Sequence, residues 1–424
     1  MNRSRFFSFV LRGIEFSLLA CLTFSASAQA TPARQPEIAA CKDPRLCSPQ
    51  AILGHTLAFQ RRAAASSSAK AVAVTTSDTK SVPVAKAHHI PPLRYFVRDL
   101  GTLGGTESFA YALNNFTQIV GLSRTAGDAA THSFIYANGH MRDLAPLNSE
   151  DILTVGPTGI NDFGQIAAGV IANGIYVPAI LDTRTHQIIT LPTLGGVTTF
   201  GFNGVAMALN RSADAVGYSY LDSLVRHAFL YHEGSLTDLD PASTGSAAEA
   251  INDAGTIAGF SFVGSSPAHA VLFQNGSVVQ INPIGSESYA HDVNNRDQVV
   301  GEYLIADGSA FHPFLYSHGV FTDLGVLDNS PEAVANAVND FQQVAGTMWI
   351  PYSSTCGGEP CTLYKQHAFT NLRGNNIDLN SAIPPHSGWE LSWGFDINNQ
   401  GNIVGYGTRG SDSFRAFLLT PAID

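Results

Sequence analysis

The stretch Ala112-Leu-Asn-Asn-Phe-Thr-Gln-Ile-Val-Gly121 returns six more times along the chain, with variations. The other copies span residues 159–168, 208–217, 250–259, 292–301, 337–346 and 396–405. Their first asparagines are Asn114, Asn161, Asn210, Asn252, Asn294, Asn339 and Asn398, spaced 47, 49, 42, 42, 45 and 59 residues apart. A period of roughly 40–50 residues is typical of the four-stranded blades of a β-propeller.

Each copy has the pattern of a β-hairpin. An apolar residue precedes Asn-Asn or Asn-Asp, and a β-branched pair such as Ile119-Val120 follows the turn. Asn and Asp bond their own backbone and tolerate left-handed dihedral angles, so they suit the turn. The β-branched pair begins the returning strand. We therefore expect the seven Asn residues to have structural roles, in the turn and in hydrogen bonds with the backbone.

A strand rich in small residues precedes the turn in several copies, for example Phe109-Ala-Tyr-Ala-Leu113 and Val205-Ala-Met-Ala-Leu209. Alanine is a poor strand former, so its repeated use in a strand needs a reason. Crowding of several blades around a common axis is such a reason, because only small side chains fit there. The pattern predicts the innermost strand of each blade.

A second motif begins about 17 residues after the Asn, where the third strand of a four-stranded blade is expected. An example is His227-Ala-Phe-Leu-Tyr231, and five copies begin with histidine: His132, His227, His269, His312 and His367. Pro178 and Arg415 replace this histidine in the second and seventh copies. A turn such as Asn138-Gly139, a strong hairpin signal, then leads to a last strand such as Met141-Arg-Asp-Leu144. Four strands in each of seven repeats predict an all-β fold, a seven-bladed β-propeller.

The two ends of the repeat region complement each other. Phe96-Val-Arg-Asp-Leu100 resembles the fourth strand of the other repeats, but no complete repeat precedes it. The last repeat ends with its third strand, Arg415-Ala-Phe-Leu-Leu419, before Pro421. We predict that residues 96–100 complete the blade built by residues 393–419, so that the N-terminal strand closes the ring and protects a sheet edge.

The repeated histidines raise the question of a metal site. They begin the third strand, two strand spacings of ~4.8 Å out from the innermost strand. Equivalent histidines of different blades are then too far apart to share an ion, and we expect structural roles for them. The sequence contains no Gly-rich phosphate loop and no His-Glu-x-x-His motif, and Gly217-Tyr-Ser219 lacks the next Gly of a nucleophile elbow. We expect no metal, no cofactor and no catalytic residue.

Three motifs in fixed order give a family resemblance: Asp-Leu-Gly-x-Leu-Gly-Gly at 99–105, Ala-Leu-Asn-Asn with Gln-Ile-Val-Gly at 112–121, and His-Ala-Phe-Leu-Tyr at 227–231. Over residues 96–420 the chain resembles the bacterial extracellular HAF-repeat family, which takes its name from the His-Ala-Phe triplet. The resemblance implies an exported bacterial repeat protein and supplies no catalytic residues. Ala168, where Gly is usual, and the lost histidines at Pro178 and Arg415 are departures, and they bear on the regularity of blades two and seven.

The repeat is interrupted in two places, and these hold all three Trp residues of the chain. Repeat six has an insertion from Trp349 to Lys365 between its second and third strands, and repeat seven has Trp389 and Trp393 before its inner strand. Loops on rigid scaffolds commonly carry function, and aromatic side chains are common recognition groups. Trp349, Tyr352, Trp389 and Trp393 are therefore candidate binding residues. The alternative is that Trp389 and Trp393 fill the packing where the ring closes.

The N-terminal residues differ in character from the repeats. Residues 1–28 read as a secretory signal peptide, with a basic start and Ala26-Ser-Ala28 as a cleavage site. A lipoprotein signal ending at Cys21 is a weaker alternative. Residues 29–93 are rich in Ala and Ser, and we expect a mobile leader before a repeat domain at 94–424. The remaining cysteines, Cys41 with Cys47 and Cys356 with Cys361, suit two local disulfides in an oxidising compartment; a zinc site would need a second ligand pair near Cys356-Gly-Gly-Glu-Pro-Cys361.

Charge narrows the range of partners. From residue 95 onward, 11 Lys and Arg stand against 30 Asp and Glu, a net charge of −19, and Lys365 is the only lysine. Such a domain repels phosphate backbones, which argues against nucleic acid as a partner. After the signal, no segment has the length and hydropathy of a membrane span. We expect a secreted or periplasmic protein that binds a glycan or another protein, with a secreted glycan hydrolase or lyase, or a structural surface or adhesion module, as alternatives.

Overall fold

The structure is a computed structural model. It describes residues 93–144, 155–198, 201–222, 225–262, 264, 267–274, 276–282, 287–327, 330–356, 359–410 and 413–422. The expected signal peptide, Cys41, Cys47 and all of the expected leader except Leu93 lie outside these residues. All described residues belong to one compact unit, Asp43–Asp424.

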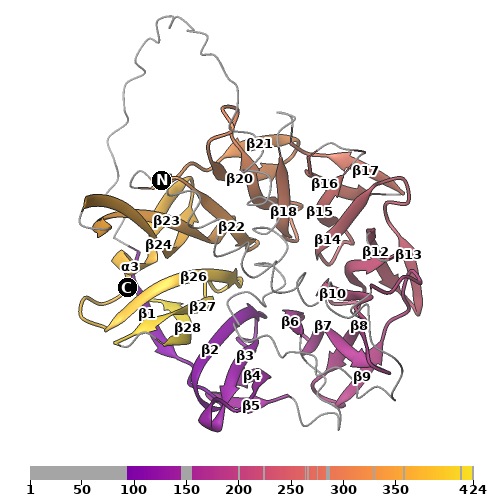
Figure 1. Ribbon diagram of the computed structural model, residues 1–424, viewed down its shortest axis with the longest axis horizontal. Helices are drawn as coiled ribbons and strands as arrows, with labels where there is room; N and C mark the ends of the chain where they lie inside the picture. Colours follow the sequence, from indigo (N-terminus) through magenta and orange to yellow (C-terminus); the bar gives the residue numbers. More distant parts are fainter. Residues whose placement is uncertain are drawn as a thin grey trace, which may run out of the picture. The chain divides into compact units, whose positions relative to one another are not determined.

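Seven four-stranded antiparallel sheets are arranged in a ring (Figure 1), and each is called a blade here. Blade 1 contains β2 (Gly104–Leu113), β3 (Ile119–Thr125), β4 (Thr131–Ala137) and β5 (His140–Asp143). Blade 2 contains β6 (Val155–Ile160), β7 (Gln165–Ala172), β8 (Ile175–Asp182) and β9 (Gln187–Thr190). Blade 3 contains β10 (Gly204–Leu209), β11 (Ala215–Tyr220), β12 (Arg226–His232) and β13 (Ser235–Asp238). Blade 4 contains β14 (Gly245–Ile251), β15 (Ile257–Phe262), β16 (His269–Gln274) and β17 (Ser277–Gln280).

The remaining blades follow the same order. Blade 5 contains β18 (Ser288–Val293), β19 (Val299–Leu304), β20 (Phe311–Ser317) and β21 (Val320–Asp323). Blade 6 contains β22 (Ala333–Val338), β23 (Gln343–Cys356), β24 (Glu359–Leu372) and β25 (Asn375–Asp378). Blade 7 contains β26 (Trp389–Ile397), β27 (Ile403–Arg409) and β28 (Phe414–Pro421) together with β1 (Tyr95–Asp99). Two short helical turns, η3 (Ala126–Asp128) and α3 (Leu379–Ala382), complete the described elements.

The N-terminal strand closes the ring, as the sequence predicts. β1 pairs antiparallel with β28, from Tyr95 opposite Pro421 to Asp99 opposite Phe417. The backbone NH of Leu100 adds a bond to the carbonyl oxygen of Ala416 at 3.0 Å. The two ends of the domain are therefore joined by strand pairing within one blade, which leaves no unpaired edge on β28.

The packing lies mainly between neighbouring blades. Each of the seven interfaces has a buried apolar cluster that takes residues from two adjacent sheets. The Phe of the His-Ala-Phe motif is central to this packing, since Phe134, Phe229, Phe314, Phe369 and Phe417 are all fully buried. Alternating alanines of the inner strands, such as Ala110 and Ala112, are buried as well. Small residues of the inner strands and, in five of the seven blades, one large aromatic of the third strand thus fill the space between blades.

A β-bulge interrupts every inner strand. In blade 5 the register shifts between Ala290 and Asp292, which leaves His291 as the extra residue. The bulge brings the inner strand so close that a Cβ on Gly301 would lie 1.9 Å from the carbonyl oxygen of Tyr289. This contact explains the Gly that ends six copies of the repeat. Ala168 is tolerated in blade 2 because the register there jumps from Val155 to Gly159, and no inner-strand residue is paired opposite Ala168.

The two interruptions of the repeat form strands where the sequence analysis expected loops. The insertion of repeat six lengthens β23 and β24 to 14 residues each, paired from Gln343 opposite Leu372 to Cys356 opposite Glu359. Trp349 and Tyr352 lie in β23, whereas Trp389 and Trp393 lie in β26. β26 begins early because Trp389 pairs with Arg409 and Leu391 with Gly407 before the inner part of the blade. Among the described residues, no helix is long and apolar enough to cross a membrane.

Candidate functional site

The seven repeat asparagines link the blades into a closed ring. The Nδ2 group of each Asn donates to the backbone carbonyl oxygen of the equivalent Asn in the next blade, over distances of 2.8–3.4 Å, and Asn398 returns to Asn114. The Oδ1 atom accepts backbone NH groups two and four residues further along, as in Phe116 and Gln118 for Asn114. One side chain therefore shapes its own turn and holds the next blade, and both ends of the amide are engaged.

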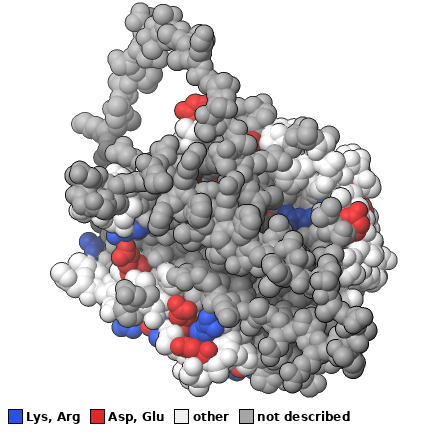
Figure 2. All heavy atoms as spheres, viewed as in Figure 1, with Lys and Arg blue, Asp and Glu red and all other residues white. Residues whose placement is uncertain are grey.

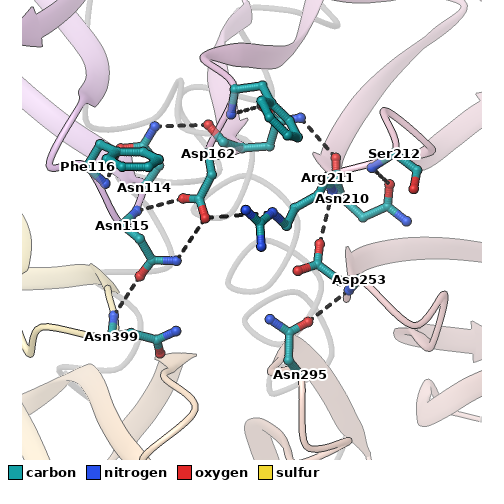
Figure 3. A network of polar contacts seen from close by, with 12 residues as sticks. Asn114, Asn115, Phe116, Asp162, Asn210, Arg211, Ser212, Asp253, Asn295 and Asn399 are labelled. Atoms are coloured by element: carbon teal, nitrogen blue, oxygen red, sulfur yellow. Dashed lines mark hydrogen bonds and ion pairs between the residues drawn. The ribbon is translucent and has the colours of Figure 1, made fainter.

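The residue after each Asn forms a second ring. Six links run from a backbone NH to a side-chain oxygen of the next blade, at 2.8–3.0 Å. These residues are Asn115, Asp162, Arg211, Asp253, Asn295, Asp340 and Asn399, and Figure 3 shows part of the network. The seventh link, from blade 2 to blade 3, is replaced by an ion pair, because Arg211 has no acceptor atom; its Nε lies 4.0 Å from Oδ2 of Asp162.

The two rings surround a cavity of about 200 Å³ on the axis, called the axial mouth here. The second ring contributes three carboxylates, Asp162, Asp253 and Asp340, and one guanidinium, Arg211. The volume is below the ~300 Å³ at which sites for drug-sized ligands begin. These residues of the second ring were not among the predicted site residues, although their position directly after each repeat Asn was a usable signal.

Two further carboxylates stand beside the mouth. Asp292 and Asp396 occupy the repeat position where four other blades have Ala. Burial raises the pKa of Asp292 to about 7, with a further contribution from the charge of Asp396, and burial raises the pKa of Asp396 to about 6. Each carboxylate accepts the NH of its own next residue and an NH of the next blade, Val338 for Asp292 and Leu113 for Asp396. Both oxygens of each group are thus used to hold neighbouring strands.

The bulge residues and their equivalent in blade 2 come from the same repeat position in each inner strand. They are Tyr111, Thr158, Met207, Glu249, His291, Asn336 and Phe395. Some of them meet between neighbouring blades: the Tyr111 and Phe395 rings are 5.3 Å apart, and Asn336 donates to the carbonyl oxygen of Gly394. Blades 4 and 5 contribute the charged part of this set.

Together with Glu302 of β19, the charged residues Glu249 and His291 form a buried Glu–His–Glu cluster. Nδ1 of His291 lies 3.3 Å from Oε2 of Glu249, and its Nε2 lies 3.8 Å from Oε1 of Glu302. The three side chains are 8%, 3% and 4% exposed. Burial alone would lower the pKa of His291, but the two carboxylates outweigh it and raise the pKa to about 10. We infer a protonated imidazolium between two carboxylates at neutral pH.

The histidines of the His-Ala-Phe motif lie within their own blades. Nδ1 contacts an Asp eleven residues later in the fourth strand, at 2.7–3.0 Å, in four pairs: His132–Asp143, His227–Asp238, His312–Asp323 and His367–Asp378. His269 has Gln280 at that distance in the sequence instead. In the closing blade Arg415 replaces the His and contacts Asp99 at 3.2 Å. In the part of the chain that the structure describes, no three His, Cys, Asp or Glu side chains are grouped to hold a metal ion.

The candidate aromatic residues are partly used in packing. The Trp349 and Trp393 rings meet edge-on at 5.9 Å, and Trp393 stacks on Phe395 at 5.5 Å. Trp389 contacts the buried Phe417 at 6.1 Å. All three Trp are half-buried. The structure brings Trp349 and Trp393 together, places Trp389 against the apolar cluster between blades 6 and 7, and leaves Tyr352 41% exposed on the long hairpin.

The expected disulfide of the long hairpin stays a prediction. The strand register places Cys356 opposite Glu359 and Cys361 opposite Ser354. The two cysteines are therefore diagonal neighbours, and diagonal Cα pairs lie at about 7–8 Å in an antiparallel ladder, slightly beyond the usual disulfide range. Their side chains lie outside the described part of the structure, as does the whole Cys41–Cys47 pair.

On the face drawn in Figure 2, charged side chains of the described residues lie in separate groups of both signs. A track for a nucleic-acid backbone would need Lys and Arg clustered along one face. On the part of this face that the described atoms show, the Lys and Arg side chains do not form such a track.

No protein-family model matches the sequence, and no curated protein matches it. Similar solved structures include TolB from Acinetobacter baumannii, at 13% identity and a TM-score of 0.37, over 54% of this chain and 61% of that one. The β-propeller domain of the Trilobed protease from Pyrococcus furiosus is 12% identical with a TM-score of 0.39, over 63% and 82%. A puromycin-hydrolyzing peptidase from Mycobacterium tuberculosis is 10% identical with a TM-score of 0.46, over 75% and 53%.

The chain spans less than two thirds of the TolB and peptidase chains. Similarity at these identities bears on the fold alone. The strand pairings of this chain, seven four-stranded sheets closed by β1 on β28, make it a seven-bladed β-propeller.

Proposed function

We propose that this propeller is an exported binding protein that recognises another protein through the long hairpin of blade 6. The observation that carries the proposal is the length of β23 and β24. The inner strand β22 reaches only as far as Met348, and the outer strand β25 pairs only from Phe369 onward. In the described ladders, residues 350–356 and 359–365 pair only with each other.

A hairpin of this kind has two properties of a protein-binding element. Among the residues that the structure describes, no further strand lies along the outer edges of this hairpin, and an extended segment of a partner can pair with the backbone NH and carbonyl groups of such an edge. The hairpin also holds Tyr352 and Tyr364 at 41% and 51% exposure. Tyrosine supplies a large, amphipathic contact surface at low entropic cost. The half-buried Trp349 and Trp393 at its base, and the Lys365–Glu390 ion pair at 2.7 Å, would extend this surface to blade 7.

Binding is favoured over catalysis by the state of two of the carboxylates near the axis, Asp292 and Asp396. A glycosidase needs two carboxyl groups free to act on substrate. Asp292 and Asp396 instead accept backbone NH groups with both oxygens. Export is proposed from residues 1–28 alone, whose basic start and cleavage site favour a secretory signal.

Shortening the hairpin tests the proposal. We would join Ile350 to Lys365 through Asn-Gly, a turn that suits a two-residue hairpin connection. Partners captured by the full-length protein from surface and culture fractions would be identified by mass spectrometry, and their affinity measured with purified components. We expect the shortened protein to lose its partner and to keep its melting temperature, because residues 351–364 contribute nothing to the buried apolar clusters of the described residues.

Phe341→Ala is the matched control, since this Phe is 64% exposed but follows the Asn of the blade 6 turn, at the opposite end of β23. It should bind the partner like the unaltered protein. A shortened protein that still binds every partner would show that the hairpin is not the recognition element.

A further inference from the structure

A second cavity lies at the turns of blades 1 and 2 and has a volume of about 280 Å³. It is lined by Phe116, Gln118, Asn138, Asp162, Phe163 and Arg184. These residues come from four separate turns or strand ends, so the cavity is a product of the fold and not of one loop. The long hairpin of blade 6 projects from the other end of its sheet, and this cavity is therefore independent of the surface proposed above.

Two phenylalanines supply its apolar part. Phe116 and Phe163 are 71% and 44% exposed. They occupy the same position of the repeat, two residues after the Asn, where other blades have Ser212, Ala254, Arg296, Phe341 and Gln400. The turn therefore has no need of an aromatic side chain. Two exposed rings beside one cavity suit a ligand with an apolar face.

The polar groups of the cavity are held in place and balanced in charge. Nη2 of Arg184 lies 3.1 Å from Oδ2 of Asp182, and its guanidinium carbon lies 5.8 Å from the centre of the Phe163 ring. Asp162 accepts the NH of Asn115 at 2.9 Å and lies 4.0 Å from Arg211. Each guanidinium thus has its own carboxylate. The amides of Gln118 and Asn138 add neutral donors and acceptors.

We propose that this cavity binds one ring of a neutral sugar, as the contact point for an extracellular glycan. A pyranose ring presents carbon-bound hydrogens on one face and hydroxyl groups at its rim. The first suits Phe116 and Phe163, and the second suits the amides, Asp162 and Arg184, because each hydroxyl is both donor and acceptor. A volume just under the ~300 Å³ lower limit of drug-sized sites fits one such ring.

The charge balance selects among other ring-shaped ligands. A uronic acid or a nucleotide would bring a negative charge to guanidinium groups that already have carboxylate partners. The domain as a whole, at −19 from residue 95 onward, repels such a ligand. A neutral sugar meets no such opposition.

The test uses the full-length protein with neutral hexasaccharides of glucose, xylose, mannose and N-acetylglucosamine, and with hexagalacturonate as the acidic comparison. Affinity would be measured by isothermal titration, and contacts by saturation transfer from aromatic protons to sugar protons. We expect at least one neutral hexasaccharide to bind and to receive saturation on carbon-bound protons. Phe163→Ala and Phe116→Ala should each weaken binding about tenfold, the upper end of the contribution of an aromatic contact.

Phe341→Ala is again the matched control. This Phe has the same repeat position, 64% exposure and an arginine, Arg296, 5.7 Å from its ring, but it is outside the cavity. The Phe341→Ala variant should bind the sugar with unchanged affinity. The protein with the shortened hairpin should also bind it unchanged, which separates this proposal from the preceding one. Binding of none of the neutral probes, binding of hexagalacturonate alone, or equal affinities in Phe163→Ala, Phe116→Ala and the unaltered protein would each overturn it.

Discussion

At the scale of single residues, the repeat is explained by the asparagine amide. Only a side chain with one acceptor and one donor end can accept NH groups of its own turn and also donate to the next blade. Aspartate keeps the first ability and loses the second. The second ring needs only an acceptor, which is why both Asn (Asn115, Asn295 and Asn399) and Asp (Asp162, Asp253 and Asp340) occur there.

This difference predicts that replacement of Asn by Asp is tolerated in the second ring but destabilises the protein in the first. Asn252 is 4% exposed and donates to the carbonyl oxygen of Asn294 at 2.8 Å. Asn252→Asp should lower the free energy of unfolding by about 1–3 kcal/mol, because it removes this donor and sets a carboxylate against the carbonyl oxygen of Asn294, which then keeps only the backbone NH of Asp297. Asn295→Asp, the control, keeps an acceptor for the NH of Asp253 and should change stability little. Urea unfolding of both variants measures this, and equal midpoints would contradict the assignment.

The Glu249–His291–Glu302 cluster makes a prediction that depends on pH. His291→Asn removes the only cation between two buried carboxylates, so we expect a loss of about 3–5 kcal/mol in unfolding free energy at pH 7. This deficit measures what the charged imidazolium contributes, so it should follow the titration of His291 in the unaltered protein.

The titration of His291 sets the direction of the pH dependence. The pKa of His291 is raised in the folded state, to about 10, so its contribution is complete below the ordinary pKa of histidine and is lost only as pH rises towards 10. The deficit of H291N should therefore be largest at pH 5 and smaller at pH 9. The triple variant E249Q/H291N/E302Q leaves no buried carboxylate unpaired and should be more stable than H291N at pH 7. Denaturant midpoints at pH 5, 7 and 9 measure all three proteins, and a pH-independent deficit in H291N would refute the charged cluster.

At the scale of strands, the repeat pattern predicted the four strands of each blade and their order, because periodic residues report which strand is innermost and where turns occur. Contacts across strands were harder to find. The pairing of His132 with Asp143 joins two motifs that the sequence shows separately. The bulge at His291 is a feature of the backbone path, and no residue type in the sequence marks its position. Trp389 and Trp393 were expected in a loop, and the bonding partners that make them part of β26 are residues of β27 that follow later in the chain.

The candidate site was predicted less well than the fold, because it too depends on contacts between segments that are separate in the sequence. Turn residues such as Phe116 and Phe163 read as ordinary members of a hairpin motif. Their common cavity depends on the angle between neighbouring blades and on Arg184, which comes from the outer turn of blade 2. The outer turn and the inner turn of one blade are brought together only by the folded sheet, so no spacing in the sequence predicts that they lie side by side.

At the scale of the whole molecule, the ring is a set of interfaces that must all close. The Asn links run from blade to blade and return from Asn398 to Asn114 at 3.1 Å. The apolar clusters lie between blades, so each blade depends on two neighbours. Blade 7 depends in addition on a strand from the other end of the domain, and Asp99 of that strand contacts both Arg415 and Arg409, at 3.2 and 3.3 Å.

This arrangement predicts how truncation affects the ring. A chain that begins at residue 93 keeps β1 and should melt like the full-length protein. A chain that begins at residue 104 exposes the edge of β28, leaves Arg415 without Asp99 and removes the buried Tyr95 from the cluster between blades 6 and 7. It should therefore unfold at a clearly lower temperature, in one transition, and associate through the open edge, as size-exclusion chromatography and thermal unfolding would show.

Because β1 is held by strand pairing and side-chain contacts, a peptide of residues 93–103 should restore the missing strand. Added to the chain that begins at residue 104, it should raise the melting temperature and suppress association, as strand addition to an open sheet edge does in other proteins. The same peptide with Asp99→Ala lacks the carboxylate that meets Arg415 and Arg409 and should restore less. If the chain that begins at residue 104 melts like the one that begins at residue 93, or if the peptide has no effect on it, then β1 does not close the ring.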